Sequence, residues 1–294
     1  MSMVAKAFKL GHAAAGLVPC RVAIAVGQAF GAVAWLVAPV KRRVAIRTMA
    51  RVIGCDPNTP NAKCKTLARE MFIYYGRYWA EFIWLRPSRQ KAVMDSLTIE
   101  GFENLRQARK QGKGVILLLP HMGNVEIFGP IAAQEQGRLV AVAERLGDAE
   151  LTEWFYQHRT KLGVEILLAD GTPNLMMNLL RALAANGAVA LLCDRKVNGA
   201  GTLSEVELFG ERTEIPSGFL LLAKHSRAPV LPCAARHTKG KGHAYQIGAP
   251  LELDLDDDEG SAQIVANHLE EFIRQAPSQW HVLTPNWPSD HSDA

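Results

Sequence analysis

Gly114-Val115-Ile116-Leu117-Leu118-Leu119-Pro120 is the stretch that decides the fold of this 294-residue chain. A continuous apolar run of this length, bounded by glycine and proline, predicts a strand that is buried on both faces of a sheet. Similar short apolar runs follow, and helical patterns lie between them, with strands expected at 138–143, 164–168, 188–193 and 229–236. This alternation predicts an α/β fold with a mostly parallel central sheet flanked by helices on both faces.

The first 90 residues have a different pattern, which predicts helices without strands. Residues 3–53 predict two helices broken near Pro39, and residues 63–84 predict a third helix rich in aromatic side chains. We therefore expect an N-terminal helical cap that associates with a membrane over residues 1–90. The α/β core should occupy residues 91–288 as one continuous domain, followed by a short tail at 289–294.

The stretch from Val22 to Val40 is 19 residues long and carries no charge. Its length would just span a bilayer core, but alanine and glycine contribute little to insertion. A signal peptide and a buried core helix are alternatives. We favour a helix that lies on the membrane surface or inserts partly, because the basic residues Lys41, Arg42 and Arg43 follow it directly.

Charge is distributed unevenly along a chain whose formal net charge is +4. Asp56 is the first acidic residue, and eight lysines and arginines precede it. This segment favours an anionic partner, which we expect to be a membrane surface and not nucleic acid, because the basic residues interleave with the apolar stretch. The five cysteines form no CxxC pair, so we expect no metal site and no disulfide framework.

Pro120-His121-Met122-Gly123-Asn124-Val125-Glu126 follows the deciding strand and carries the candidate chemistry. Positions five apart lie roughly 140° apart around a helix, so His121 and Glu126 meet only if His121 stands outside the helix, with Gly123 permitting the turn. Glu126 would then accept one imidazole N–H and leave the other nitrogen as a general base. The chain has no GxSxG motif, so the nucleophile would be a substrate hydroxyl. The alternative is a histidine that only hydrogen-bonds backbone at a helix cap.

Several ordered segments resemble the glycerolipid and lipid A acyltransferases, over about residues 10–288. PHMGNVE resembles their H-x4-D/E block, although Glu126 stands where this branch often has Asp. Asp194 stands where mannoside enzymes carry Glu, and no FPEG-type block is present. The last segment is most similar to actinobacterial phosphatidylinositol mannoside acyltransferases. The further matching segments are Val142–Leu146, Trp154–Gly163, Leu192–Arg195, Glu207–Glu211, Pro216–Gly218, Val230–Cys233 and Gln279–Trp287.

The resemblance implies an acyltransferase that moves a palmitoyl-length group from acyl-CoA, as co-substrate, to a hydroxyl of a mannosylated phosphatidylinositol. It needs no permanently bound cofactor and no metal, and we expect it at the inner face of the plasma membrane as a peripheral or monotopic protein. A lipid A or lysophospholipid acceptor is the alternative within this class, and a non-catalytic lipid-binding protein is the alternative outside it.

Other polar residues complete the predicted site. Backbone N–H groups near Asn124 could stabilise an oxyanion. Arg145, Arg159 and Arg195 are candidates for binding phosphate, because the guanidinium matches phosphate with a fork of donors, but ordinary ion pairs are the alternative. Asp194 would orient sugar hydroxyls or Arg195. Ser217 and Gly218 would line the donor channel, or only cap a helix.

Overall fold

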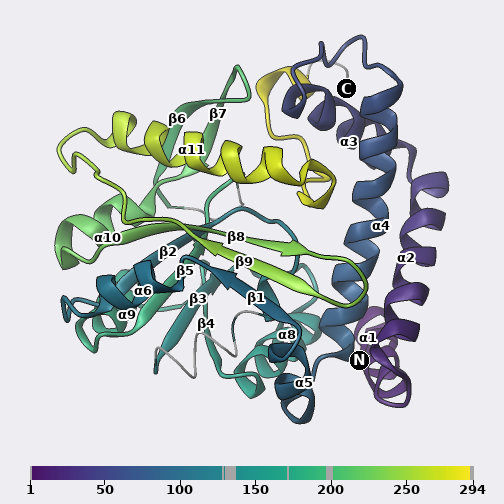
Figure 1. Cartoon of the computed structure of the whole chain (residues 1–294), viewed down its shortest axis with the longest axis horizontal. Coiled ribbons are helices and arrows are strands. Elements are labelled where there is room, and N and C mark those ends of the chain that lie inside the picture. Colours follow the sequence, from purple (N-terminus) through teal and green to yellow (C-terminus); the bar gives the residue numbers. More distant parts are fainter. Residues whose placement is uncertain (1, 128, 130–136, 171, 197–200, 292–294) are drawn as a thin grey trace.

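The computed structural model describes residues 2–127, 129, 137–170, 172–196 and 201–291. A seven-stranded sheet lies at its centre, in the order β1-β9-β8-β2-β5-β3-β4 (Figure 1). Neighbouring strands are parallel except β8 and β9, which form an antiparallel hairpin. The predicted α/β class with a mostly parallel sheet is therefore confirmed. The bounds are β1 Leu97–Glu100, β2 Val115–Leu119, β3 Leu139–Ala143, β4 Val164–Leu168, β5 Ala188–Leu192, β8 Val230–His237 and β9 His243–Ile247.

Strand β2 separates two hydrophobic cores. Ile116 and Leu118 belong to one core, and Val115, Leu117 and Leu119 belong to the other. Every residue of β2 is buried, as its apolar sequence predicts. Helices cover the two faces, and they comprise α6 (Phe102–Arg109), α8 (Ala149–Lys161), α9 (Leu175–Ala184), α10 (Gly218–Ser226) and α11 (Asp258–Gln275).

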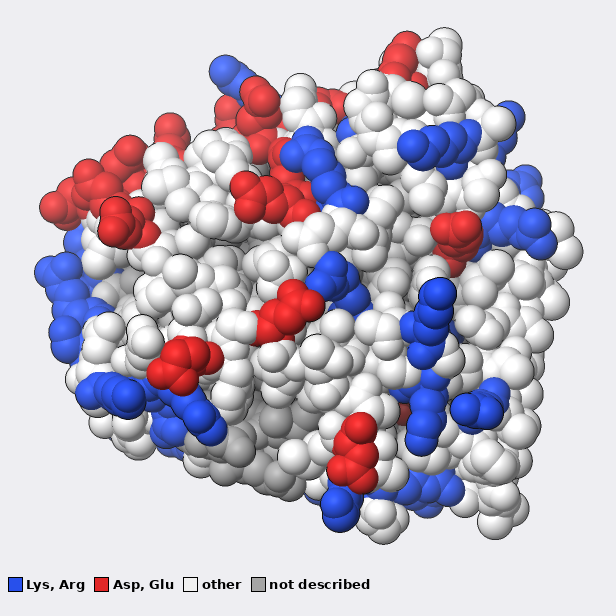
Figure 2. Space-filling model, viewed as in Figure 1, with Lys and Arg blue, Asp and Glu red and all other residues white. Residues whose placement is uncertain are grey.

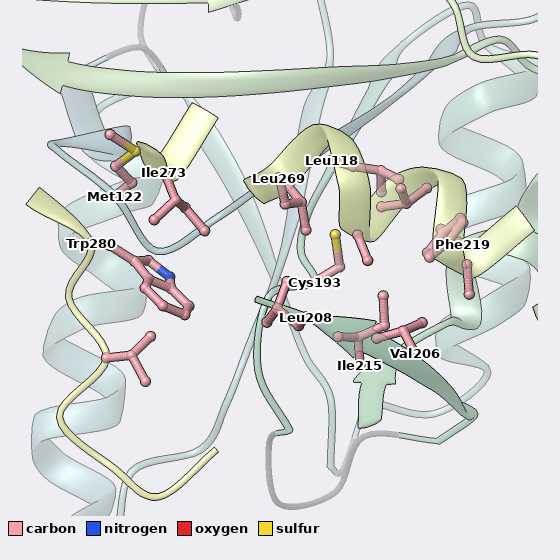
Figure 3. Close-up of a cluster of buried hydrophobic side chains, with 14 of the residues drawn as sticks. Leu118, Met122, Cys193, Val206, Leu208, Ile215, Phe219, Leu269, Ile273 and Trp280 are labelled. Carbon is pink, nitrogen blue, oxygen red and sulfur yellow. The ribbon is translucent and has the colours of Figure 1, made fainter. Parts of the chain in front are cut away.

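A small second sheet closes the larger core. Strands β6 (Leu203–Leu208) and β7 (Glu211–Pro216) pair antiparallel and lie beside α11. Their inward residues Val206, Leu208 and Ile215 pack with Cys193, Phe219 and Leu269 in the cluster that Figure 3 shows. Short elements complete the chain, namely η1 (Pro87–Arg89), α5 (Gln90–Met94), η2 (Pro277–Gln279) and η3 (Pro288–His291).

The N-terminal region consists of helices, but not of the number expected. Residues 3–53 form three helices, α1 (Met3–Ala15), α2 (Cys20–Val37) and α3 (Pro39–Val52). The expectation of two was wrong, because Pro19 stands as the N-cap of α2 and starts a new helix there. The break at Pro39 is confirmed, and α4 (Ala62–Trp84) runs along one side of the molecule between α2 and the sheet (Figure 1).

Helices α2 and α4 meet in backbone contact. Gly27 and Gly31 of α2 face Gly76 and Phe72 of α4, and a Cβ atom added at any of the three glycines would overlap the opposite backbone. Small residues spaced four apart let two helices approach this closely. The contact fixes α2 to the rest of the protein through one narrow stripe.

The opposite face of α2 is exposed. Val22, Val26, Phe30, Val33 and Val37 form an apolar stripe at helical spacing, and 46% to 71% of each is exposed. The helix is long and apolar enough to cross a membrane by length and composition, and only 22% of it is buried. The buried-core alternative for this segment is therefore wrong.

The domain boundaries at 90 and 288 stay predictions, although Ser289 and Asp290 of the expected tail are bonded to Arg47 and Arg51 of α3.

Gly76→Ala should lower the free energy of unfolding by about 1–3 kcal/mol, because the added methyl overpacks the contact with Gly27. Urea denaturation followed by circular dichroism measures this change. Gly11→Ala is the matched control, since a Cβ at Gly11 of α1 meets no atom within 4 Å. That control should leave the stability unchanged or raise it by up to about 1 kcal/mol. Equal effects of the two substitutions would contradict the close helix contact.

Candidate active site

The sheet register brings His121 and Asp194 together. Strands β2 and β5 are parallel neighbours with Leu119 paired to Leu192, so each side chain stands two residues beyond a matched strand end. His121 Nδ1 lies 2.6 Å from Asp194 Oδ1, and the His121 backbone N–H donates to Asp194 Oδ2 at 2.9 Å. The carboxyl ends of parallel strands are where open α/β sheets place their ligands. One carboxylate therefore holds both the ring and the backbone of the candidate base.

Asp194 is fully buried and remains ionised. Trp280 Nε1 donates to Asp194 Oδ2 at 2.5 Å, and the Asn286 side-chain amide donates to the Asp194 carbonyl. Burial raises the pKa of Asp194, but the neighbouring imidazole and the hydrogen bonds from His121 and Trp280 outweigh it, and the net shift is downward. The carboxylate is thus available to hold the Nδ1–H of His121 and to stabilise a positive charge on its ring.

The C-terminal segment clamps the His121 loop. The Gly123 N–H donates to the Gln279 carbonyl at 2.9 Å, and the His281 N–H donates to the His121 carbonyl at 2.7 Å. Gly123 has a positive φ of 59°, and a Cβ atom there would overlap the Ala235 carbonyl. Only glycine therefore fits this turn. The turn that Gly123 was expected to permit is present, and it places His121 outside the helix that follows.

Glu126 does not hold His121, contrary to the sequence-based pairing. Its carboxylate accepts from Arg159 Nη2 at 2.6 Å, from Arg159 Nε, and from the Tyr78 hydroxyl at 3.0 Å. Burial raises the pKa of Glu126, but Arg159 and Tyr78 lower that pKa by more. The net shift is downward, so Glu126 stays ionised. Glu126 binds Arg159 because α8 places this guanidinium directly against the carboxylate. A buried carboxylate is stabilised more by a full positive charge than by a neutral imidazole.

Asn124 lies beneath the loop and is fully buried. Its amide donates to Glu81 Oε2 at 2.9 Å, its Oδ1 accepts from the Glu126 N–H, and its carbonyl accepts from the Tyr245 hydroxyl. These bonds connect the loop to α4 and β9. The side chain is therefore fully engaged in supporting the loop, and the oxyanion role of nearby N–H groups stays a prediction.

Glu81 is the centre of a buried polar cluster behind the site. It also accepts from Arg77 Nε at 2.8 Å and from His243 Nε2 at 2.9 Å, while His237 Nδ1 lies 3.5 Å away. Glu81, His237 and His243 are close enough together to hold a metal ion. Arg77 already neutralises the carboxylate, so a divalent ion would add uncompensated buried charge. We therefore treat the cluster as a support for the loop, and the expectation of no metal stays a prediction.

The remaining predicted residues do not gather around His121. Arg159 is bound to Glu126, and Arg145 pairs with Asp170 at 3.5 Å on the surface. Arg195 lies 3.8 Å from Glu144. Because it follows Asp194 directly, it is the arginine nearest in sequence to the His121–Asp194 pair. Gly218 begins α10, and Ser217 precedes it as a buried residue whose hydroxyl has no hydrogen-bond partner among the described residues. Binding roles for these residues stay predictions.

The Nε2 atom of His121 is left open for a substrate, and His281 lies beside the loop. Its side chain is 23% exposed, and the described residues place no hydrogen-bond partner on Nε2. His281 packs against Tyr75 and Tyr78, and burial lowers the pKa of His281 to about 4, so its ring is neutral at physiological pH. The arrangement leaves a single oriented nitrogen that can accept a proton from a bound hydroxyl.

An α/β sheet with an imidazole–carboxylate pair at its strand ends, and no serine nucleophile motif, is typical of an enzyme that transfers a group directly between two bound substrates. The model of the bacterial lipid A biosynthesis acyltransferase family matches residues 8–289. The chain therefore belongs to the bacterial lipid A biosynthesis acyltransferase family, and it is an acyltransferase.

Similar characterised proteins agree with this assignment. A phosphatidylinositol mannoside acyltransferase of Mycobacterium tuberculosis (strain CDC 1551 / Oshkosh) is 32% identical over 251 residues, which cover 84% of this chain and 78% of that protein. The phosphatidylinositol mannoside acyltransferase of Mycolicibacterium smegmatis is 31% identical over 249 residues, which cover 84% and 80%. A lipid A biosynthesis acyltransferase of Haemophilus influenzae is more distant, at 25% identity over 182 residues, which cover 61% and 55%.

Asp194→Asn should reduce kcat on the order of ten-thousand-fold, because the amide holds the wrong tautomer of His121. Glu126→Gln is the informative comparison, since Glu126 bonds Arg159 and not His121. It should lower the thermal stability by leaving Arg159 without its counter-ion, with a much smaller loss of kcat. Steady-state kinetics and thermal melts of both variants measure these effects. A larger kcat loss for Glu126→Gln would restore the pairing expected from sequence.

Proposed function

We propose that this protein transfers a long fatty acyl group from acyl-CoA to a hydroxyl of a membrane glycolipid, with a mannose of a phosphatidylinositol mannoside as the acceptor. The bond between His121 Nδ1 and the buried Asp194 carboxylate carries the catalytic part of the proposal. The printed names of the mycobacterial relatives support the choice of acceptor. The acyl-CoA donor rests on the resemblance seen in the sequence.

The proposed reaction uses His121 as a general base. Nε2 takes the proton of the acceptor hydroxyl while the hydroxyl oxygen attacks the thioester carbonyl. Asp194 keeps the proton on Nδ1 and stabilises the resulting imidazolium. When the tetrahedral intermediate collapses, the C–S bond breaks and the imidazolium returns its proton to the leaving thiolate. General-base assistance of this kind contributes about a hundred- to ten-thousand-fold in rate.

In this scheme Glu126 does not contact His121 and acts by supporting the loop that carries it. Glu126 lies in the first turn of the helix after the loop, where Arg159 of α8 and Tyr78 of α4 hold it. Asn124 is held to the same helix α4 through Glu81. These bonds fix the position of His121 relative to the N-terminal helices, so the base and the expected membrane face belong to one rigid support.

Membrane association is proposed from the surface of the N-terminal helices. The exposed stripe of α2 continues into Leu36, Val37 and Val40, and the basic residues Lys41, Arg42 and Arg43 follow at the start of α3. In Figure 2 the right-hand side of the molecule, over α2 to α4, carries mainly blue and white atoms, whereas red atoms gather at the upper left, near the start of α11. An apolar face beside basic residues is typical of a helix bound to anionic lipid.

His121→Ala should abolish acyl transfer while the protein stays folded. The assay incubates the purified protein with radiolabelled palmitoyl-CoA and separate acceptors, namely phosphatidylinositol mannosides, a lysophospholipid and a lipid A precursor, and identifies the labelled product. Label on the mannoside that disappears in the variant supports the proposal. Transfer to another acceptor would correct the substrate, and appreciable activity in the variant would exclude His121 as the base.

Phe30→Glu should weaken binding to anionic vesicles about tenfold or more, because it places a charge in the exposed stripe of α2. Met177→Glu is the matched control, since Met177 is a similarly exposed apolar residue of α9, outside the N-terminal helices. Co-sedimentation with phosphatidylcholine vesicles containing phosphatidylinositol measures the partition coefficient. Equal binding of the two variants would remove the membrane role of α2.

A further inference from the structure

A cleft of about 290 Å³ lies between α1, η1 and α8. Its lining is basic and aromatic and includes no carboxylate. It exceeds the volume of one liquid water, about 30 Å³, several times over, so it has room for more than a single ion. The side chains that matter are His12 of α1, Arg86, and Trp154, Gln157, His158 and Lys161 of α8 or its end.

Among the described residues, neither cation of the cleft has a counter-ion. Arg86 donates through Nη2 to the His12 carbonyl, and no described residue forms a hydrogen bond with its buried Nε. Lys161 is exposed, and in the described part of the chain no carboxylate oxygen lies within 4.0 Å of Arg86 or Lys161. Like charges at a concave, partly apolar surface produce a positive potential that attracts anions.

The two histidines face the cleft as neutral rings. His12 Nδ1 lies 2.7 Å from the Ile83 carbonyl and His158 Nε2 lies 3.0 Å from the Phe82 carbonyl, so each donates one N–H to backbone. The rings pack against Trp154, which stacks on His158 at a centroid distance of 5.1 Å. Burial and the nearby cations lower the pKa of His12, and burial lowers the pKa of His158 to about 4. The positive charge therefore resides on Arg86 and Lys161.

We propose that this cleft binds a phosphate ester. Arg86 supplies a fork of donors that matches phosphate oxygens, with one buried donor still unsatisfied, and Lys161 supplies a second charge. Trp154 offers an apolar wall for the rest of the molecule. His12 of the lining belongs to α1, whose Leu10 is exposed, so a phospholipid headgroup is one source of the phosphate, and CoA is the other.

The proposal is tested by isothermal titration calorimetry of the full chain in a phosphate-free, non-ionic detergent. The three probes are inorganic phosphate, glycerophosphoinositol and CoA. Lys161→Gln removes one charge, and among the described residues the Lys161 side chain takes part in no hydrogen bond or ion pair that would be lost. Gln157→Glu places a carboxylate in the lining. Arg86 is left intact because it also binds α1. Lys113→Gln is the matched control, since Lys113 is exposed in the loop before β2 and does not line the cleft.

At least one probe should bind, and both cleft variants should weaken its Kd about tenfold or more while Lys113→Gln leaves it unchanged. Preference for glycerophosphoinositol identifies a lipid headgroup site, preference for CoA identifies a donor subsite, and equal binding of all three identifies a simple phosphate subsite. Absence of binding by every probe at millimolar concentration, or equal binding by all variants, overturns the proposal. The measurement needs no turnover, so its outcome is independent of the proposed acyl transfer.

Discussion

The carboxylate of Asp194 is the point on which the site depends. It is fully buried, and it binds the His121 ring, the His121 backbone and the Trp280 indole at once. Three donors converge on two oxygens, so the group is compensated for its burial and has a single orientation. The position of His121 then follows from the sheet, because β2 and β5 deliver both residues at one edge in matched register.

Helix α4 joins the catalytic edge to the N-terminal cap. One of its faces receives α2 through the glycine contact, and another bears Tyr78 and Glu81, which hold Glu126 and Asn124. The aromatic side chains of α4 therefore pack mainly against other rings, including Phe155, His281 and Phe8, and one of them, Tyr78, also holds Glu126. Most of the large apolar side chains that are exposed in the N-terminal region belong to α1 and α2.

Much of the fold follows from the sequence because local patterns determine it. The apolar run of β2, the strand and helix alternation after residue 97 and the break at Pro39 all have local physical causes. Strand β7 was not anticipated, since Glu211-Arg212-Thr213-Glu214 is polar and is half-buried only through its pairing with β6. The break at Pro19 also escaped prediction, because an apolar segment on both sides concealed it.

The structure places His121 beyond a buried strand, as expected, but a different carboxylate holds it. His121 was found because it follows a buried strand, but its partner was sought five residues away along the chain. The true partner is 73 residues distant and follows the next strand in space. The available signal was that Leu192-Cys193-Asp194 also ends a buried run. Converting that signal into a pair requires the strand order, which one sequence read without coordinates does not contain.

The clamp formed by Gln279, Trp280 and His281 has a consequence for biosynthesis. They are translated about 160 positions after His121, and Trp280 is translated 86 positions after the Asp194 that it binds. The whole seven-stranded sheet is therefore synthesised before the contacts around His121 and Asp194 can be completed. Until Trp280 has left the ribosome, the nascent chain lacks the indole that donates to Asp194, so the carboxylate acquires its final set of donors only late in synthesis.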